Sequence, residues 1–167
     1  MKLLTSAAAN KLIKSLEDQK SYLLSLESES CTYVMADNER VDPPEYDYIA
    51  TSNELYTINC QVQKLKHAIN IFNTTTILSP LEITIDEALI RMAQLNNRKS
   101  QLDKMRRRLP KERQTPLFNR TMTPEYQYVN YDLVRVGEDY KKLCEQINQI
   151  QLLLDTCNQT KTFEIDV

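Results

Sequence analysis

The sequence predicts a mainly α-helical protein: four long amphipathic helices that form two duplicated helix hairpins in a coiled-coil-like bundle, with short β segments near the loops and the C-terminus. Three observations support this fold class. Only one of the 167 residues is glycine, which disfavours the tight turns of a sheet protein. Apolar residues recur at alternating steps of three and four, which places one apolar stripe on each helix. The length fits a single helical domain, 1–167.

Four segments follow this helical spacing, near residues 3–28, 51–73, 85–109 and 133–157. In the first, the stripe consists of Leu12, Leu16, Gln19, Leu23 and Leu26. In the second, it consists of Leu55, Ile58, Val62, Leu65, Ile69 and Phe72. Such stripes predict knobs-into-holes packing of each helix against a neighbour.

Local signals predict where the helices begin. Thr51 with Glu54, and Thr84 with Glu87, fit the capping box in which a hydroxyl and a carboxylate satisfy the first free amides of a helix. Asp132 is a candidate N-cap for the fourth helix.

Other signals predict helix ends, close contacts and strands. Pro110 is expected to stop the third helix, because its ring clashes with a continuing turn. Gly137 lies inside the fourth helix, where it is expected to mark a close helix contact. Three segments are candidate short strands: Tyr46–Ile49, Tyr126–Val129 and Thr162–Val167.

The chain also resembles itself, which predicts an internal repeat of residues 1–79 and 80–167. Helical register explains the matching apolar positions, but it does not explain why Pro44–Ile49 and Pro124–Val129 share Pro-Glu-Tyr-x-Tyr followed by Ile or Val. The helix ends match as well, in Asn73 and Thr75 with Asn158 and Thr160.

Charge is unevenly distributed along the chain. Residues 27–54 contain eight acids and one base, a formal charge of −7, whereas residues 98–120 contain nine bases and two acids, a formal charge of +7. A candidate polyanion-binding or nucleic-acid-binding segment lies within the second region: Lys104, Arg106, Arg107, Arg108, Lys111 and Arg113. The alternative interpretation is a solvated helix end whose bases complement the helix dipole.

Two further groups of residues are candidate sites. Paired helix ends could form a small ligand pocket from Asn70, Asn73, Thr75, Asn158 and Thr160, although these side chains could equally satisfy the last helix carbonyls. The exposed rings of Tyr46, Tyr48, Tyr126, Tyr128 and Tyr131 could stack on bases, or simply cover one end of the bundle.

Nothing in the sequence indicates a catalytic site, a metal or a cofactor. His67 is the only histidine, and none of the four cysteines belongs to a C-x-x-C pair. A run of apolar residues long enough to span a membrane is absent, so no membrane partner is expected. Free thiols are typical of a reducing compartment, which favours a cytoplasmic location.

The sequence resembles an uncharacterised bacterial helical family whose members often carry the label septicolysin. The resemblance is most specific at Ile69–Thr76, at Thr84–Arg91 and in the last helix, while Ala93 replaces an expected acid and the 29–50 segment is longer than usual. It implies a helical fold and a bacterial cytoplasmic origin, and no established activity.

The resulting functional prediction is a non-enzymatic helical protein that self-associates as a homo-oligomer through its apolar stripes. The alternatives are polyanion or nucleic-acid binding through residues 104–113, and an enzyme with an unrecognised site. No small-molecule ligand is identifiable from the residues.

Overall fold

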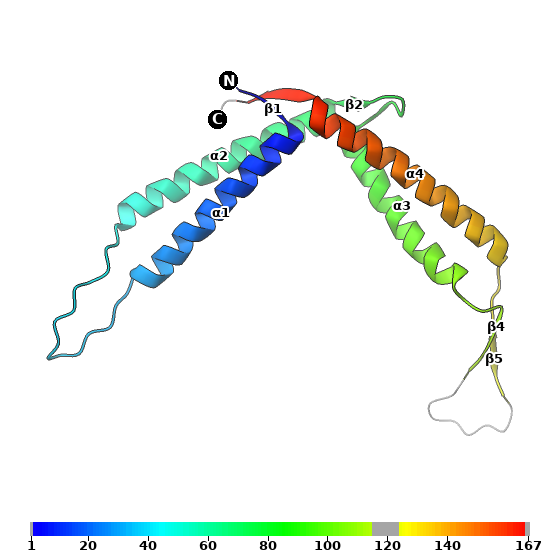
Figure 1. The fold of residues 1–167 in the computed structure, drawn as a ribbon, viewed down its shortest axis with the longest axis horizontal. Coiled ribbons are helices and arrows are strands. Elements are labelled where there is room, and N and C mark those ends of the chain that lie inside the picture. The colour runs from blue at the N-terminus through cyan, green and yellow to red at the C-terminus, as the bar shows by residue number, and fades with distance from the viewer. Residues whose placement is uncertain (1, 115–123, 166–167) are drawn as a thin grey trace. The chain divides into compact units, whose positions relative to one another are not determined.

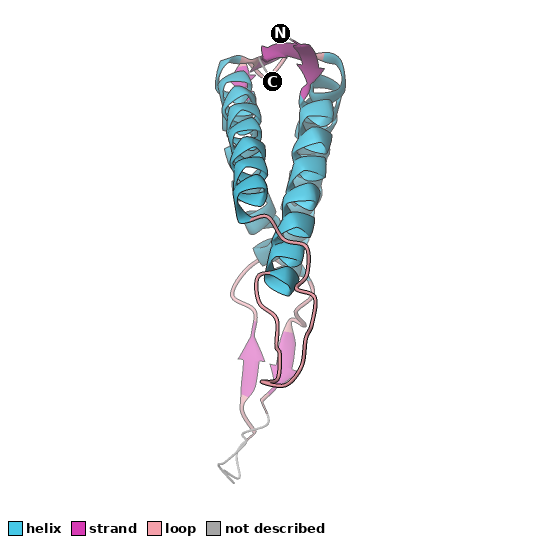
Figure 2. Cartoon of the chain, turned by 90° about the vertical axis from the view of Figure 1, so that its left-hand side faces the viewer, coloured by secondary structure: helices cyan, strands magenta, loops and turns pink. Residues whose placement is uncertain are grey.

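The computed structural model describes residues 2–114 and 124–165. In this part of the chain the helices dominate, and the strands are short stretches next to helix ends (Figure 2). The prediction of a mainly helical protein with short β segments is therefore confirmed. The residues group into two compact units: Met1–Thr76 with Thr156–Val167, here named unit 1, and Ile77–Asp155, named unit 2.

Unit 1 is a helix hairpin closed by a two-stranded sheet. It consists of β1 (Lys2–Thr5), α1 (Ser6–Ser30), α2 (Tyr48–Thr75) and β6 (Thr162–Ile165). The two helices run side by side (Figure 1), and β1 pairs with β6 in an antiparallel register. Because β6 follows the last helix, this pairing joins the two ends of the chain.

The core of unit 1 lies at the sheet end of the hairpin. Ala9 and Ile13 of α1 are buried with Leu65 of α2 and Ile165 of β6. The ring of Phe72 lies 5.0 Å from that of Phe163, measured between centroids. Residues from both chain ends therefore complete the core that α1 and α2 begin.

Unit 2 contains a second helix pair and two short hairpins. Its elements are β2 (Ile77–Leu78), β3 (Ile83–Thr84), α3 (Ile85–Arg106), β4 (Lys111–Arg113), β5 (Tyr126–Tyr128) and α4 (Leu133–Thr160), whose last turn belongs to unit 1. β2 pairs with β3, and β4 pairs with β5, both antiparallel. A contact between α3 and α4 is made by Arg106, whose guanidinium lies 4.2 Å from the ring centroid of Tyr140.

The order of elements is the same in both halves of the chain. Strand, helix, helix and strand follow one another as β1–α1–α2–β2 and as β3–α3–α4–β6, with the β4–β5 pair inserted in the second half. The two Pro-Glu-Tyr-x-Tyr segments differ, however, because Tyr48 begins α2 whereas Tyr126 and Tyr128 lie in β5.

Two of the three predicted helix starts are confirmed. At α3, the Glu87 amide donates to Thr84 Oγ1 at 3.2 Å and the Thr84 amide donates to Glu87 Oε2 at 2.7 Å, which completes the capping box. At α4, Asp132 Oδ1 accepts from the amides of Val134 and Arg135 at 2.8 and 3.2 Å.

The start predicted for the second helix is wrong. α2 begins three residues earlier than Thr51, and Asp47 caps it by accepting from the Ala50 amide at 3.0 Å. The predicted strand at Tyr46–Ile49 is wrong for the same reason, since Tyr48 and Ile49 lie inside the helix. An N-cap carboxylate outweighs the strand preference of the tyrosines here.

Tertiary pairing changed the other boundaries. Residues 3–5 form β1 instead of the first turn of a helix, because they pair with the strand correctly predicted near the C-terminus. α3 ends at Arg106, before Pro110, and α4 continues to Thr160. The β2–β3 hairpin was not predicted at all.

Gly137 does not mark a close helix contact. A Cβ atom built at this position would meet nothing within 4 Å, so that prediction is wrong. The structure gives no steric reason for glycine at this position.

We expect the α3 capping box to be a local source of stability. Replacing Thr84 with Ala should lower the free energy of unfolding by about 1 kcal/mol, because the Glu87 amide loses its acceptor. Urea unfolding measures this, with the exposed α3 residue Ser100→Ala as the control. Equal midpoints for the two variants would contradict the assignment.

The same box predicts a pH dependence. Hydrogen bonds from the Thr84 backbone and hydroxyl hold the pKa of Glu87 below its ordinary value of 4.5. The contribution is therefore present above that value and lost as the pH falls through the lowered pKa. The difference between wild type and Glu87→Gln should be clear at neutral pH and vanish in strong acid, as urea unfolding at both pH values measures.

Candidate interaction surfaces

The predicted polyanion-binding residues all lie in unit 2, around the end of α3 and the strand that follows. Lys104 and Arg106 are in α3, Arg107 is its C-cap, and Arg108 follows the cap. Lys111 and Arg113 are in β4. All six are exposed.

Some of these bases already have partners within the chain. Arg106 and Arg107 form ion pairs with Asp103 at 2.6 and 2.8 Å, and the guanidinium of Arg106 lies 4.2 Å from the Tyr140 ring centroid. The hydrogen bond from Arg106 lowers the pKa of Asp103. Among the described residues, no ion-pair partner occurs for the remaining bases of the set.

The β4–β5 pair, here named the ribbon, separates its side chains by chemistry. Lys111 lies opposite Tyr128, and Arg113 lies opposite Tyr126. Since alternate residues of a strand point to opposite faces, these four side chains share one face. The pair between them, Glu112 opposite Gln127, belongs to the other face.

Lysine and tyrosine are in direct contact on the first face. Lys111 Nζ lies 4.1 Å from the ring centroid of Tyr126 and 5.4 Å from that of Tyr128. Both rings are exposed, at 41% for Tyr126 and 62% for Tyr128. Sequence analysis predicted the tyrosine strand but missed its partner strand 111–113, although the alternating Lys-x-Arg could have suggested it.

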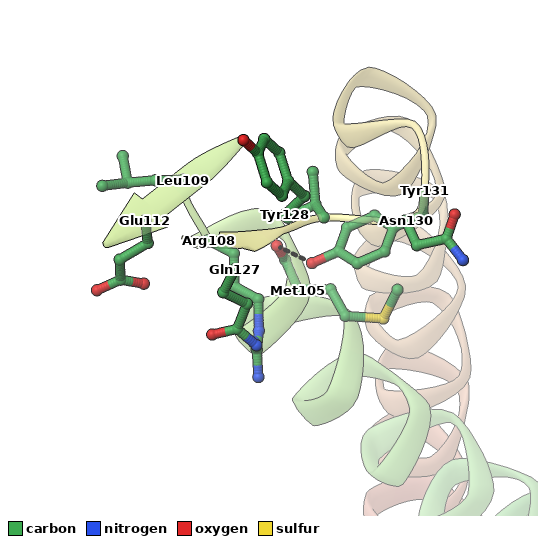
Figure 3. A pocket seen from close by; sticks show the side chains of 9 residues that line it. Met105, Arg108, Leu109, Glu112, Gln127, Tyr128, Asn130 and Tyr131 are labelled. Carbon is green, nitrogen blue, oxygen red and sulfur yellow. Dashed lines mark hydrogen bonds between the residues drawn. The ribbon is translucent and has the colours of Figure 1, made fainter. Parts of the chain in front are cut away.

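A hollow of about 310 Å³ lies where the ribbon joins the helices (Figure 3). The Tyr131 hydroxyl donates to the Met105 carbonyl at 2.9 Å and so closes its floor against the end of α3. Arg108, Gln127, Tyr128 and Asn130 also line it. The hollow therefore offers one guanidinium, the Glu112 carboxylate, two side-chain amides and two tyrosine rings, at the lower limit of size for a ligand site.

The predicted apolar stripe of unit 1 is incompletely covered. The buried residues of α1 end at Ile13. Beyond it, Leu16, Leu23 and the α2 residue Leu55 are half-buried and Leu26 is 40% exposed, whereas Ile58 of α2 is buried. The stripe is thus well packed near the sheet and open toward the far end of the hairpin.

Polar side chains join α1 and α2 along that open part. Lys66 Nζ lies 2.7 Å from Glu17 Oε1, and Gln19 donates to Glu54 Oε1 at 2.9 Å. Lys20 completes the series by donating to Asn59 Oδ1 at 2.8 Å. These bonds are exposed, and such pairs contribute only about 0–1 kcal/mol each.

Two threonines of the predicted ligand pocket satisfy carbonyls in the last turn of their own helices. Thr75 Oγ1 donates to the Ile71 carbonyl at 2.8 Å, and Thr160 Oγ1 donates to the Thr156 carbonyl at 2.7 Å. Asn70 instead lines a hollow of about 320 Å³ on the α1–α2 pair.

The histidine and the cysteines are not part of the surfaces described above. His67 is exposed on α2, all four cysteines are free, and burial raises the pKa of Cys157. Within residues 2–114 and 124–165, no three His, Cys, Asp or Glu side chains gather as metal ligands would. No helix in these same residues is long and apolar enough to cross a membrane.

Comparison with known proteins adds a likeness of fold. No family model matches the sequence, and no curated protein matches it. The structure is similar to the crystal structure of a functionally unknown conserved protein from Corynebacterium diphtheriae, with a TM-score of 0.67 and 15% identity. The match covers 98% of this chain and 100% of the other, and at this identity it shows the fold alone.

We expect Tyr131 to fix the ribbon to α3. Tyr131→Phe should lower the free energy of unfolding by about 1 kcal/mol, because the Met105 carbonyl loses a half-buried hydrogen bond. The control is Tyr22→Phe, at a ring that is 64% exposed on α1. Urea unfolding measures the stability of both variants. Hydrogen exchange of the backbone amides of residues 107–114 should accelerate in Tyr131→Phe and not in Tyr22→Phe. Equal exchange in both variants would contradict this role.

Proposed function

We propose that this chain is a non-enzymatic helical interaction protein that self-associates, and that a second copy covers the open part of the unit 1 stripe. The observation that supports this most directly is the end of burial at Ile13 in a helix that continues to Ser30. Past that point, Leu16, Leu23 and Leu26 of the α1 stripe are not fully covered within the hairpin, although Ile58 of α2 is buried.

Energetics favour an apolar partner for this surface. Full burial of one leucine contributes about 1.5–3 kcal/mol, whereas each of the exposed polar pairs that join α1 and α2 contributes about 0–1 kcal/mol. Leu16 and Leu23 are already half-buried and Leu26 is 40% exposed, so a partner that covers all three would gain a part of this contribution from each. Two isolated helices are also marginal without further packing.

A second copy is the partner that the chain itself supplies. Every copy has the same stripe, and a two-fold interface places the same patch on both subunits. Residues 27–54 have a formal charge of −7, so copies with these segments side by side would repel each other. We therefore propose an antiparallel arrangement with coiled-coil packing, which keeps the acidic segments apart.

Three further proposals accompany this one. The shared order of strand, helix, helix and strand supports an internal duplication. We also propose a relation to the septicolysin-labelled family, based on the resemblance at Ile69–Thr76 and Thr84–Arg91, segments that include the end of α2 and the start of α3. The four free cysteines support a cytoplasmic location.

The proposal predicts that two leucines of equal exposure behave differently. Leu26 is on the stripe and 40% exposed, whereas Leu24 is off the stripe and 43% exposed. Leu26→Glu should weaken association about tenfold or more, because burying an unpaired carboxylate costs several kcal/mol. Leu24→Glu should leave association unchanged. Light scattering after size-exclusion chromatography, over a dilution series, measures both.

Circular dichroism must show the same helix content in both variants. A wild-type monomer at the highest concentration would reject the proposal. Equal association of Leu26→Glu and Leu24→Glu would reject the stripe as the interface.

A further inference from the structure

We infer that the Lys111–Tyr128 face of the ribbon binds single-stranded nucleic acid, with bases stacked on the tyrosines and phosphates held by the neighbouring cations. This face is on unit 2 and does not depend on the self-association proposed for unit 1. Its four residues are Lys111, Arg113, Tyr126 and Tyr128.

The face combines the two groups that single strands require. Such proteins bind the backbone through positive charge and bind successive bases by stacking them on aromatic rings. In this ribbon, each tyrosine lies opposite a positively charged residue of the other strand. Tyr126 and Tyr128 are two residues apart on one strand, so their rings project from the same face.

Acidic charge is directed away from this face. Glu112 is the acidic residue of the two strands, and it pairs with Gln127 on the opposite face. Gln114 Nε2 donates to Gln127 Oε1 at 2.7 Å, so the opposite face is joined by neutral side chains. On the tyrosine face itself a polyanion would therefore meet Lys111 and Arg113, whereas Glu112 is on the opposite face and lines the hollow at the base of the ribbon.

Positive charge continues from the ribbon toward α3. Arg108 is exposed and lines the hollow at the base of the ribbon, where its side chain lies beside Gln127 and away from the Tyr128 ring (Figure 3). Arg106 and Arg107 are partly neutralised by Asp103. Arg108 therefore adds a positive charge near the ribbon that Asp103 does not neutralise, while Lys111 and Arg113 are the cations of the tyrosine face itself.

Stabilisation of the ribbon alone does not account for the arrangement. A single lysine over a single ring would provide the cation–π contact, which is weak at an exposed site. Lys111 lies closer to the Tyr126 ring than to the Tyr128 ring, and Tyr128 remains 62% exposed as a residue. A double helix hides the faces of its bases, so a stacking surface selects single strands over duplex.

The first test uses the wild-type full-length chain. Fluorescence anisotropy would compare a labelled single-stranded DNA of about 12 nucleotides with an abasic oligomer of equal charge and with the matching duplex. We expect saturable binding at low salt, at least about tenfold tighter for the strand with bases than for either competitor.

Three results would overturn the inference. These are no binding at low salt, equal binding of the abasic strand, and equal or tighter binding of the duplex. Equal binding of the abasic strand would leave a phosphate site without stacking. Because this test uses only the wild-type protein, misfolding of a variant cannot explain any of these results.

The second test assigns binding to the face. Tyr126→Leu with Tyr128→Leu should weaken single-strand binding about tenfold or more and leave abasic binding unchanged. The matched control is Tyr22→Leu with Tyr56→Leu, at rings that are 64% and 71% exposed on unit 1. Equal losses in the two pairs of variants would reject the ribbon as the site.

Variants of the charged residues test which face of the ribbon contacts the phosphates. Lys111→Gln with Arg113→Gln should reduce the salt dependence by about two counterions, whereas Glu112→Gln on the opposite face should not weaken binding. Tyr126→Phe with Tyr128→Phe keeps the rings and should retain binding, which shows that the ribbon tolerates substitution. An unchanged salt dependence in the lysine–arginine variant would overturn the assignment of phosphates to this face.

Discussion

The antiparallel pairing of β1 with β6 is the interaction on which unit 1 depends. It joins the first described residues to the last ones and inserts Ile165 among the apolar residues of α1 and α2. Closing such a long loop costs entropy, but the cost grows only slowly with length and burial of the strand side chains offsets it. The best-packed part of the hairpin is therefore next to this sheet, where Ala9 and Leu65 are fully buried.

Packing becomes looser with distance from that sheet, and this gradient links the fold to the proposed function. Near β1 and β6, a third layer covers the helix pair. Farther along, α1 and α2 have only each other: Ile58 of α2 is still buried, but no residue of α1 beyond Ile13 is, and exposed polar bonds join the helices. A two-helix layer cannot cover its own apolar stripe on all sides, so the uncovered leucines define a surface for association.

Unit 2 uses its insertion differently. The β4–β5 ribbon contributes little to a core, since all six of its strand residues are exposed. Its strands instead sort side chains onto two faces, one basic and aromatic, the other polar. The hydrogen bond from Tyr131 to the Met105 carbonyl attaches the ribbon to the end of α3 and so fixes the position of these side chains. A short exposed element with such sorted chemistry is more typical of recognition than of stability.

Sequence patterns predicted those structural features that depend only on residues close together in the chain. The four helices, the Thr84–Glu87 capping box and the Asp132 cap follow from apolar spacing and from side chains within three positions of the amides they satisfy. The strand near residue 162 and the strand at Tyr126 were also predictable from composition. The basic segment was visible as a run of charge, but its pairing with the tyrosines was not.

By itself, the sequence determined that this protein is mainly helical and where its apolar, basic and tyrosine-rich segments lie. Only the tertiary structure decided that residues 2–5 are a strand, that α1 is buried no farther than Ile13, and that Lys111 and Arg113 share a face with two tyrosines. Each of these depends on a partner distant in sequence. Helical periodicity is a local property, whereas strand pairing and burial are set by which distant segments meet.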